Sequence, residues 1–516
     1  MSQQIQTFSI TAPGFYGLNT QDSSLDLSSG FALTAVNCVI DQYGRIGARK
    51  GWIKKHSVNA DLSTASVTAI GQLVVDNGSE YTIAAGNNKL FKLTGSTLSQ
   101  LTYGGGGTAP TITASNWQIA TLNECLYLFQ IGHDPLVFDP AVSTTTYRRV
   151  SERAGYAGVV PQANIAISAY GRLWVAETTT EKTVVYWSDI LSGHIWTGGS
   201  TGSIDVSSVW PNGADNVTGL ASHNGFLFIF GKNNILVYSG AQDVLSAGVF
   251  RISDSITGIG CIARDTIQNT GSDVIFLSDT GVRSVLRTIQ EKSAPFRDLS
   301  KNVRNDLMNA VQGEVASNIK SVYSPFESFY LLSLPGLKEV FCFDMKTVLQ
   351  DGSSRVTVWD SIEPKSFCYL RDKSLLIGKA GYIGQYSGHQ DDGNAYRFQY
   401  FTNHTDLGTP SVSSVLKKLS VVIIGGSNQF LTMKWGYDFK ENYYSQNVNI
   451  PLQGVAEYGI SEYNIAQYAD GVSLQTLVAY PTGSGKVIQT GYEADINGSA
   501  LSIQKIEIQA KNGKIV

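Results

Sequence analysis

The sequence predicts an all-β protein, a seven-bladed β-propeller followed by a C-terminal β-sandwich-like domain. Three observations support this. One strand–turn–strand unit recurs seven times between residues 80 and 390. The 516-residue chain holds 52 glycines and many aromatic residues, a composition typical of short strands joined by tight turns. From residue 394 the repeat is lost, but alternating apolar strands continue.

Each repeated unit is an apolar strand, a turn of small polar residues, and a second strand that closes on an aromatic or aliphatic residue. Phe226–Ser239 is the clearest copy. The closing positions recur at intervals of about 43 to 58 residues, near the period of a four-stranded blade. Since one blade cannot bury both of its faces, blades must stack and close into a ring. The seven units are residues 81–94, 126–139, 172–188, 226–239, 274–285, 328–344 and 375–387.

The seventh blade, residues 366–388, shows three strands and lacks a fourth. Propellers remove such an open edge by lending a terminal strand to the incomplete blade. We therefore expect residues 44–54 to complete a propeller spanning residues 44–390, with residues 1–43 as an N-terminal arm. A six-bladed ring with an extra hairpin is the alternative.

One helix is predicted, at residues 299–313, as an insertion between blades five and six. Val303, Leu307 and Val311 recur there at four-residue spacing, which places them on one helix face.

Residues 391–516 form the expected C-terminal domain, which contains a tyrosine repeat in a loop at residues 455–470. Tyr458, Tyr463 and Tyr468 are five residues apart. That step matches neither a helix face nor one face of a strand. We expect a protruding loop that contacts a neighbouring subunit or a lumen; packing on the domain's own sandwich is the alternative.

Composition points away from several classes of function. Only 16% of residues are charged and the net charge is −4, which gives no basic excess for tight nucleic-acid binding. The five cysteines and six histidines show no metal-ligand spacing. No catalytic, metal or cofactor site is predicted. The N-terminus lacks the features of a secretory signal, so we expect synthesis in a cytoplasm.

Two motifs that contain lysine or arginine are candidates for binding phosphate or an acidic partner. Pro481–Lys486 is similar to a phosphate-binding loop, but Tyr480, Val487 and the strand-like residues that follow do not fit one, so a hairpin turn is favoured. The densest basic cluster is predicted to be a solvated strand edge, with contact to an acidic partner or DNA backbone as the alternative. It consists of Arg45, Arg49, Lys50, Lys54 and Lys55.

Five motifs point to one known family: Ala12–Asp22, Asp41–Trp52, the Tyr186–Asp189 loop with Trp196, the turn Trp435–Phe439 and the tyrosine repeat. Together they resemble the tail nozzle, or tail tubular B-like, proteins of short-tailed bacteriophages.

The resemblance implies a structural virion protein and no enzyme. Such nozzles form six-fold homo-oligomeric rings beneath the head-to-tail adaptor, carry tail fibres or spikes, and let double-stranded DNA pass during ejection. It also implies assembly into the virion tail, with outer-membrane contact at the tip. The alternative is a receptor- or glycan-binding propeller of a phage tail, in which exposed tryptophans and tyrosines stack on sugars.

Overall fold

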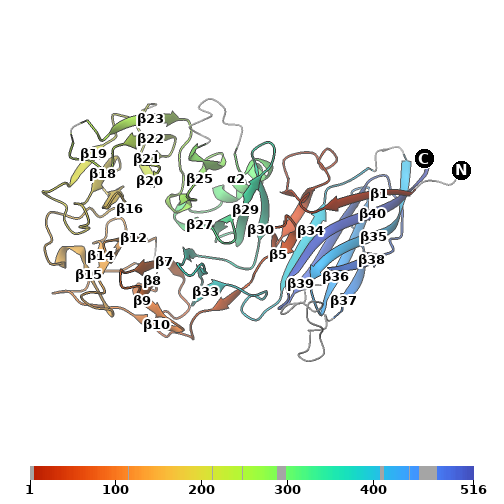
Figure 1. The fold of residues 1–516 in the computed structure, drawn as a ribbon, viewed down its shortest axis with the longest axis horizontal. Helices are drawn as coiled ribbons and strands as arrows, with labels where there is room; N and C mark the ends of the chain where they lie inside the picture. Colours follow the sequence, from red (N-terminus) through yellow and green to blue (C-terminus); the bar gives the residue numbers. More distant parts are fainter. Residues whose placement is uncertain are drawn as a thin grey trace, which may run out of the picture.

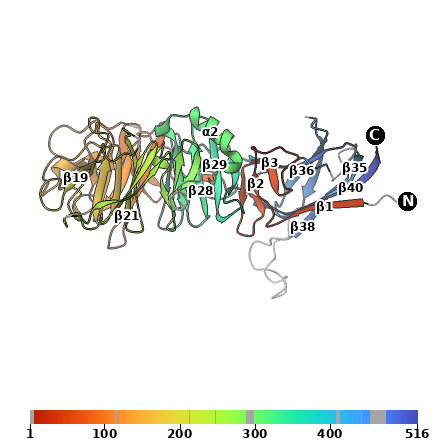
Figure 2. The ribbon, with the colours of Figure 1, turned by 90° about the horizontal axis from the view of Figure 1, so that it is seen from above.

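The computed structural model is all-β and has two parts, a ring of radial sheets and a sandwich beside it (Figure 1). It describes residues 5–113, 116–211, 213–246, 248–286, 298–406, 412–440, 442–451 and 474–515, with side chains up to residue 511. Seen from above, the ring is a flat disc and the sandwich extends away from its rim (Figure 2).

The ring has seven blades, as the repeat predicts. Blades one and two are β7 (Val67–Val74), β8 (Glu80–Gly86), β9 (Lys89–Thr94) and β10 (Thr97–Gln100), then β12 (Gln118–Leu122), β13 (Cys125–Phe129), β14 (Leu136–Phe138), β15 (Thr146–Arg149) and the parallel edge strand β11 (Thr102–Tyr103). Blades three and four are β16 (Ile165–Ala169), β17 (Arg172–Ala176), β18 (Val184–Trp187) and β19 (Gly202–Asp205), then β20 (Val217–His223), β21 (Phe226–Gly231), β22 (Asn234–Ser239) and β23 (Arg251–Thr257).

Within the described residues, blade five has three strands, whereas blades six and seven have four each. Blade five is β24 (Gln268–Asn269), β25 (Val274–Ser278) and β26 (Gly281–Ser284). Leu299 donates its backbone N–H to the carbonyl oxygen of Val282 in β26. Blade six is β27 (Lys320–Ser324), β28 (Phe329–Leu334), β29 (Glu339–Val348) and β30 (Ser354–Trp359). Blade seven is β31 (Ser366–Tyr369), β32 (Leu375–Gly378), β33 (Ile383–Tyr386) and β6 (Trp52–Lys54).

Alternation along each middle strand explains why the blades stack. In β21, Leu227 and Ile229 face blade three, whereas Phe228 and Phe230 face blade five. Every neighbouring pair of blades shares a buried apolar cluster in this way, including blades seven and one. The first strand of each blade also contacts the first strand of the next, up to β31 with β7. The ring is therefore closed.

The closing strand is shorter than the sequence suggests. β6 pairs with β33 through Trp52 opposite Tyr386, but Ile46–Ala48 forms β5 in a sandwich sheet. This differs from the expectation of one closing strand over residues 44–54. The two strands are separated at Gly51, where a Cβ would lie 1.8 Å from the Gln390 carbonyl oxygen, so only glycine lets the chain pass.

The predicted helix is present between blades five and six. α2 (Arg304–Gln312) follows a short 3-10 turn, η3 (Lys301–Val303). Val303, Leu307 and Val311 are all buried against the blades, as their spacing predicts. Further 3-10 turns are η1 (Val150–Glu152), η2 (Arg264–Thr266) and η4 (Ala316–Asn318).

The sandwich is built from both ends of the chain. One sheet has the order β38-β35-β40-β5-β4, with β1 also paired to β40; its strands are β1 (Ile5–Thr11), β4 (Cys38–Ile40), β5 (Ile46–Ala48), β35 (Val412–Gly425), β38 (Leu474–Ala479) and β40 (Leu501–Ile515). The facing sheet contains β3 (Phe31–Val36), β34 (Tyr396–Thr402), β36 (Gln429–Tyr437), β37 (Tyr444–Ile450) and β39 (Ile488–Ile496). The residues expected to form an N-terminal arm thus supply strands to both sheets, because their apolar positions are buried in the sandwich core.

Blade six and the sandwich share one continuous ten-stranded sheet. The outer strand β30 pairs in parallel with β2 (Gly17–Leu18) at Gly17–Val356 and with β3 at Val36–Val358. β3 then pairs antiparallel with β34. Gly17 is required at this junction because its φ is +77° and a Cβ would lie 2.6 Å from the Val356 carbonyl oxygen.

Candidate functional site at the propeller axis and the sandwich junction

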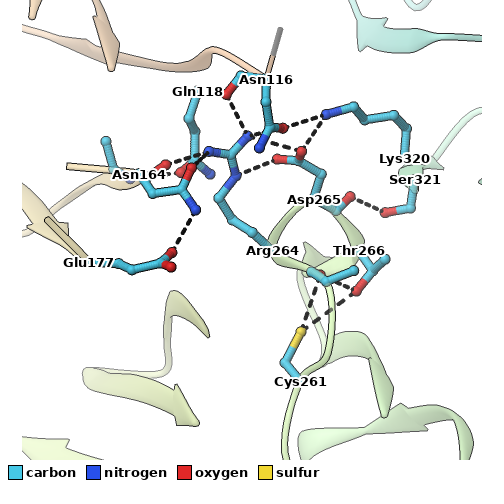
Figure 3. Close-up of polar contacts among 12 residues, drawn as sticks. Asn116, Gln118, Asn164, Glu177, Cys261, Arg264, Asp265, Thr266, Lys320 and Ser321 are labelled. Atoms are coloured by element: carbon cyan, nitrogen blue, oxygen red, sulfur yellow. Dashed lines mark hydrogen bonds and ion pairs between the residues drawn. The ribbon is translucent and has the colours of Figure 1, made fainter. Parts of the chain in front are cut away.

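A polar cluster lies where several first strands of the blades begin (Figure 3). Asn116 precedes β12, Asn164 precedes β16, Lys320 opens β27, and Arg264 and Asp265 form η2 just before β24. The cluster therefore collects side chains from blades two, three, five and six at one face of the ring.

Arg264 is the centre of this cluster, and all five of its N–H groups have acceptors. Nη1 donates to the backbone oxygen and to Oδ1 (2.8 Å) of Asn164. Nη2 donates to the backbone oxygen (3.0 Å) and to Oδ1 (2.7 Å) of Asn116. Nε and Nη2 also contact the two carboxylate oxygens of Asp265 at 2.8 and 3.0 Å. Full satisfaction is what a buried guanidinium requires.

Lys320 completes the cluster from blade six. Its Nζ contacts the Asp265 carboxylate and donates to Asn116 Oδ1 at 2.9 Å. Burial alone would raise the pKa of Asp265, but Arg264 and Lys320 lower it to about 2. Burial lowers the pKa of Lys320, although Asp265 opposes this.

The network connects opposite sides of the ring. Blades two and three lie across the ring from blades five and six (Figure 1). A side chain that reaches from η2 to Asn116 and Asn164 must therefore cross the central axis. At this face the middle of the propeller is occupied by a satisfied ion-pair network.

The predicted basic cluster is largely paired within the chain. Arg45 contacts Asp41 at 2.6 Å and Lys54 contacts Asp392 at 2.6 Å. Lys50 pairs with Glu327, and Lys55 donates to Gln385 Oε1 at 2.9 Å. The expectation of a solvated strand edge is wrong for Arg49, whose side chain is 0% exposed.

Arg49 instead links the propeller to the sandwich. It holds both Asp391 oxygens at 2.8 and 2.9 Å and donates to Asn37 Oδ1 at 2.9 Å. Its guanidinium lies 4.0 Å from the ring centroid of Tyr396 on sandwich strand β34. Burial alone would lower the pKa of Arg49, but Asp391 raises it above the usual value.

Two other predicted features are the tyrosine repeat and the Pro481–Lys486 turn. Tyr458, Tyr463 and Tyr468, like the whole loop 455–470, lie outside the described residues. Pro481–Lys486 joins β38 in one sandwich sheet to β39 in the facing sheet. It is thus an inter-sheet connection and the hairpin assignment is wrong, because β38 pairs with β35 and β39 pairs with β34 and β36.

A cavity of about 580 Å³ opens between blades two and three. It lies between the loop after β13, the segment before β16 and the loop after β17, near the face that carries the Arg264 network.

The described ranges contain neither a metal-binding cluster nor a membrane-spanning helix. Within them, no group of three or more His, Cys, Asp or Glu side chains is arranged to hold a metal ion. The helices in the same ranges include none with the length and apolarity needed to cross a membrane.

Comparisons with known proteins give distant similarities. No protein-family model matches the chain, and no curated protein matches it. The chain is similar to PorZ of the Porphyromonas gingivalis type-IX secretion system (11% identity, TM-score 0.35, 64% of this chain and 37% of that one). It is also similar to the extracellular domain of the putative one-component system BT4673 of B. thetaiotaomicron (10%, 0.40, 88% and 61%). A third similarity is to the WD40 domain of Toxoplasma gondii coronin (10%, 0.36, 68% and 87%).

The chain thus spans less than two thirds of the first two of these proteins. The propeller description rests on the seven stacked sheets and not on these similarities.

Proposed function

We propose that this chain is a structural virion protein, a tail nozzle subunit of a short-tailed bacteriophage with no enzymatic role. Six copies form a ring that docks on the head-to-tail adaptor and encloses the passage for DNA ejection. The observation that supports this best is the sheet that runs unbroken from blade six into the sandwich.

A ring subunit must keep its two contact surfaces at a fixed angle, because a heterologous contact closes only at one rotation. In this chain, backbone pairing at Val356 and Val358 fixes the propeller relative to the sandwich. The buried Arg49–Asp391 pair adds a second link between propeller and sandwich. The subunit is therefore suited to act as one rigid block.

The propeller's own axis is not the DNA passage in this proposal. The Arg264 network spans the axis at one face. The channel instead lies between subunits, around the six-fold axis of the ring.

Charge also favours a conduit over a DNA-binding protein. The chain carries a net charge of −4, and Arg45, Arg49, Lys50 and Lys54 are paired with carboxylates. Each phosphate that a protein neutralises adds salt-dependent affinity, which would slow transit. Pairing these four cations within the chain therefore favours transit of DNA over binding.

The remaining contacts of the proposal follow from the same family resemblance. The adaptor binds at one end of the ring, tail fibres or spikes bind at its side, and the tip reaches the host outer membrane. Tyr458, Tyr463 and Tyr468 are proposed to contact a neighbouring subunit or the lumen. The protein is made in the host cytoplasm and assembles into the virion tail.

Mass photometry and negative-stain electron microscopy, with and without the purified adaptor, test this proposal. We expect six-fold rings with an open centre, at least on the adaptor. Replacing Tyr458, Tyr463 and Tyr468 together by Ala should weaken ring formation without changing the circular dichroism spectrum. Tyr480→Ala, at a residue 69% exposed, is the matched control. Monomers under both conditions would refute the ring.

A further inference from the structure

Hydrogen bonds hold segments on two sides of the cavity between blades two and three. Asp134 in the loop after β13 accepts hydrogen bonds from Arg149 Nε at 3.0 Å and from Gln162 Nε2 at 2.9 Å. Across the cavity, Thr178 Oγ1 accepts the Glu181 N–H at 3.0 Å, which fixes the loop after β17. A site held in this way loses little conformational freedom when a ligand binds.

The lining combines hydroxyl groups with apolar surface. Ser151, Tyr156 and the threonines 178–180 contribute hydroxyls. Val159, which is 83% exposed, lies beside the buried Val160 and contributes apolar surface. The volume of about 580 Å³ is within the range of sites that bind small ligands. A hydroxyl group can both donate and accept a hydrogen bond. Such groups beside apolar carbon suit a ligand that has both hydroxyl groups and C–H faces.

The carboxylates that line the cavity restrict the charge that a ligand can carry. The two lining carboxylates are Asp134, which pairs with Arg149, and Glu181, which accepts a hydrogen bond from the Tyr186 hydroxyl. Burial and Glu181 raise the pKa of Tyr186 to about 12, so this phenol is protonated at neutral pH. An anionic ligand would meet carboxylates, and a cationic ligand would find one of the two already neutralised.

We propose that this cavity is a binding site for a neutral oligosaccharide. Glu181 and the hydroxyls of the exposed Thr179 and Thr180 bond sugar hydroxyls, while the Val159 surface covers C–H groups. The site lies within one subunit, so it does not depend on ring assembly.

The test starts with an array of neutral and acidic oligosaccharides, and the strongest neutral hit is then titrated by calorimetry. We expect Thr179→Arg, which fills the cavity, and Glu181→Gln to weaken binding about tenfold or more. Thr97→Arg and Glu80→Gln on blade one are the matched controls and should leave affinity unchanged. Glu80, like Glu181, is an exposed carboxylate that accepts one side-chain hydrogen bond.

Spermidine and inorganic phosphate serve as the cationic and anionic probes. The proposal is overturned if no neutral glycan binds, or if binding survives Thr179→Arg. It is equally overturned if only spermidine or only phosphate binds in a way that depends on residues 179 and 181. Ring formation by the same variants, measured in parallel, separates this result from the nozzle proposal.

Discussion

The guanidinium of Arg49 donates two hydrogen bonds, of 2.8 and 2.9 Å, to the carboxylate of Asp391, which lies 342 residues further along the chain. Asp391 lies just beyond blade seven, and Tyr396 beneath the guanidinium belongs to the sandwich. One ion pair therefore joins the closing region of the propeller to the neighbouring domain.

Asp391→Asn should lower the free energy of unfolding by about 3 to 5 kcal/mol, because it leaves a buried guanidinium without its counter-charge. Urea denaturation followed by circular dichroism measures this. Asp61→Asn is the control, since its pair with Lys89 is half exposed and should contribute about 1 kcal/mol or less. Equal effects of the two substitutions would show that the Arg49 pair has no special role.

The axial network should make stability depend on pH in the acid range. The pKa of Asp265 is about 2 when folded and about 3.9 when unfolded, so its ionisation favours folding above the unfolded value. The contribution, about 2 to 3 kcal/mol at pH 7, is lost as the pH falls from about 5 towards 2.

Asp265→Asn tests this expectation. The stability difference from the wild type should be largest at pH 7 and should shrink by pH 3, as measured by urea denaturation at each pH. A difference that is constant across this range would mean that the charge of Asp265 does not stabilise the fold.

All five cysteines are free thiols that should be unreactive in the folded protein. Burial raises the pKa of each thiol, to about 12 for Cys125, Cys261 and Cys368. A thiol-specific colorimetric reagent at pH 8 should therefore label at most one group slowly before unfolding and five in urea. Cys368 is the partly exposed one, so Cys368→Ser should remove the slow native fraction. Rapid labelling of several thiols would contradict the burial described above.

The sequence predicted the repeating parts of this fold better than the junctions between them. Leu227 and Phe228 alternate within a period that recurs seven times, so local pattern was enough to predict blades and their number. Ile46 offered no such signal, because its partner Ile503 is far along the chain and one short strand resembles another. Only three residues, Arg49, Lys50 and Gly51, separate its strand from β6.

The candidate site was the least predictable part. Arg49 looked like one member of a surface cluster, since sequence does not reveal that Asn37 and Asp391 surround it. Arg264 and Lys320 were missed because no spacing rule relates blades five and six to Asn116. The available signal was weak: polar or charged residues stand at or shortly before the start of these first strands.

Closure of the ring should depend on Trp52 more than on any exposed residue of the same strand. Trp52 lies opposite Tyr386 and packs in the cluster between blades six and seven. Trp52→Ala should cost about 3 to 5 kcal/mol through lost burial and the remaining cavity. Ile53→Ala is the control, because Ile53 is 45% exposed on the other face of the strand and should cost less than about 1 kcal/mol. Urea denaturation gives both values, and limited proteolysis should cut Trp52→Ala near residues 55–66 faster than the control. If the two variants unfold at the same urea concentration, the packing of Trp52 in β6 does not stabilise the closed ring.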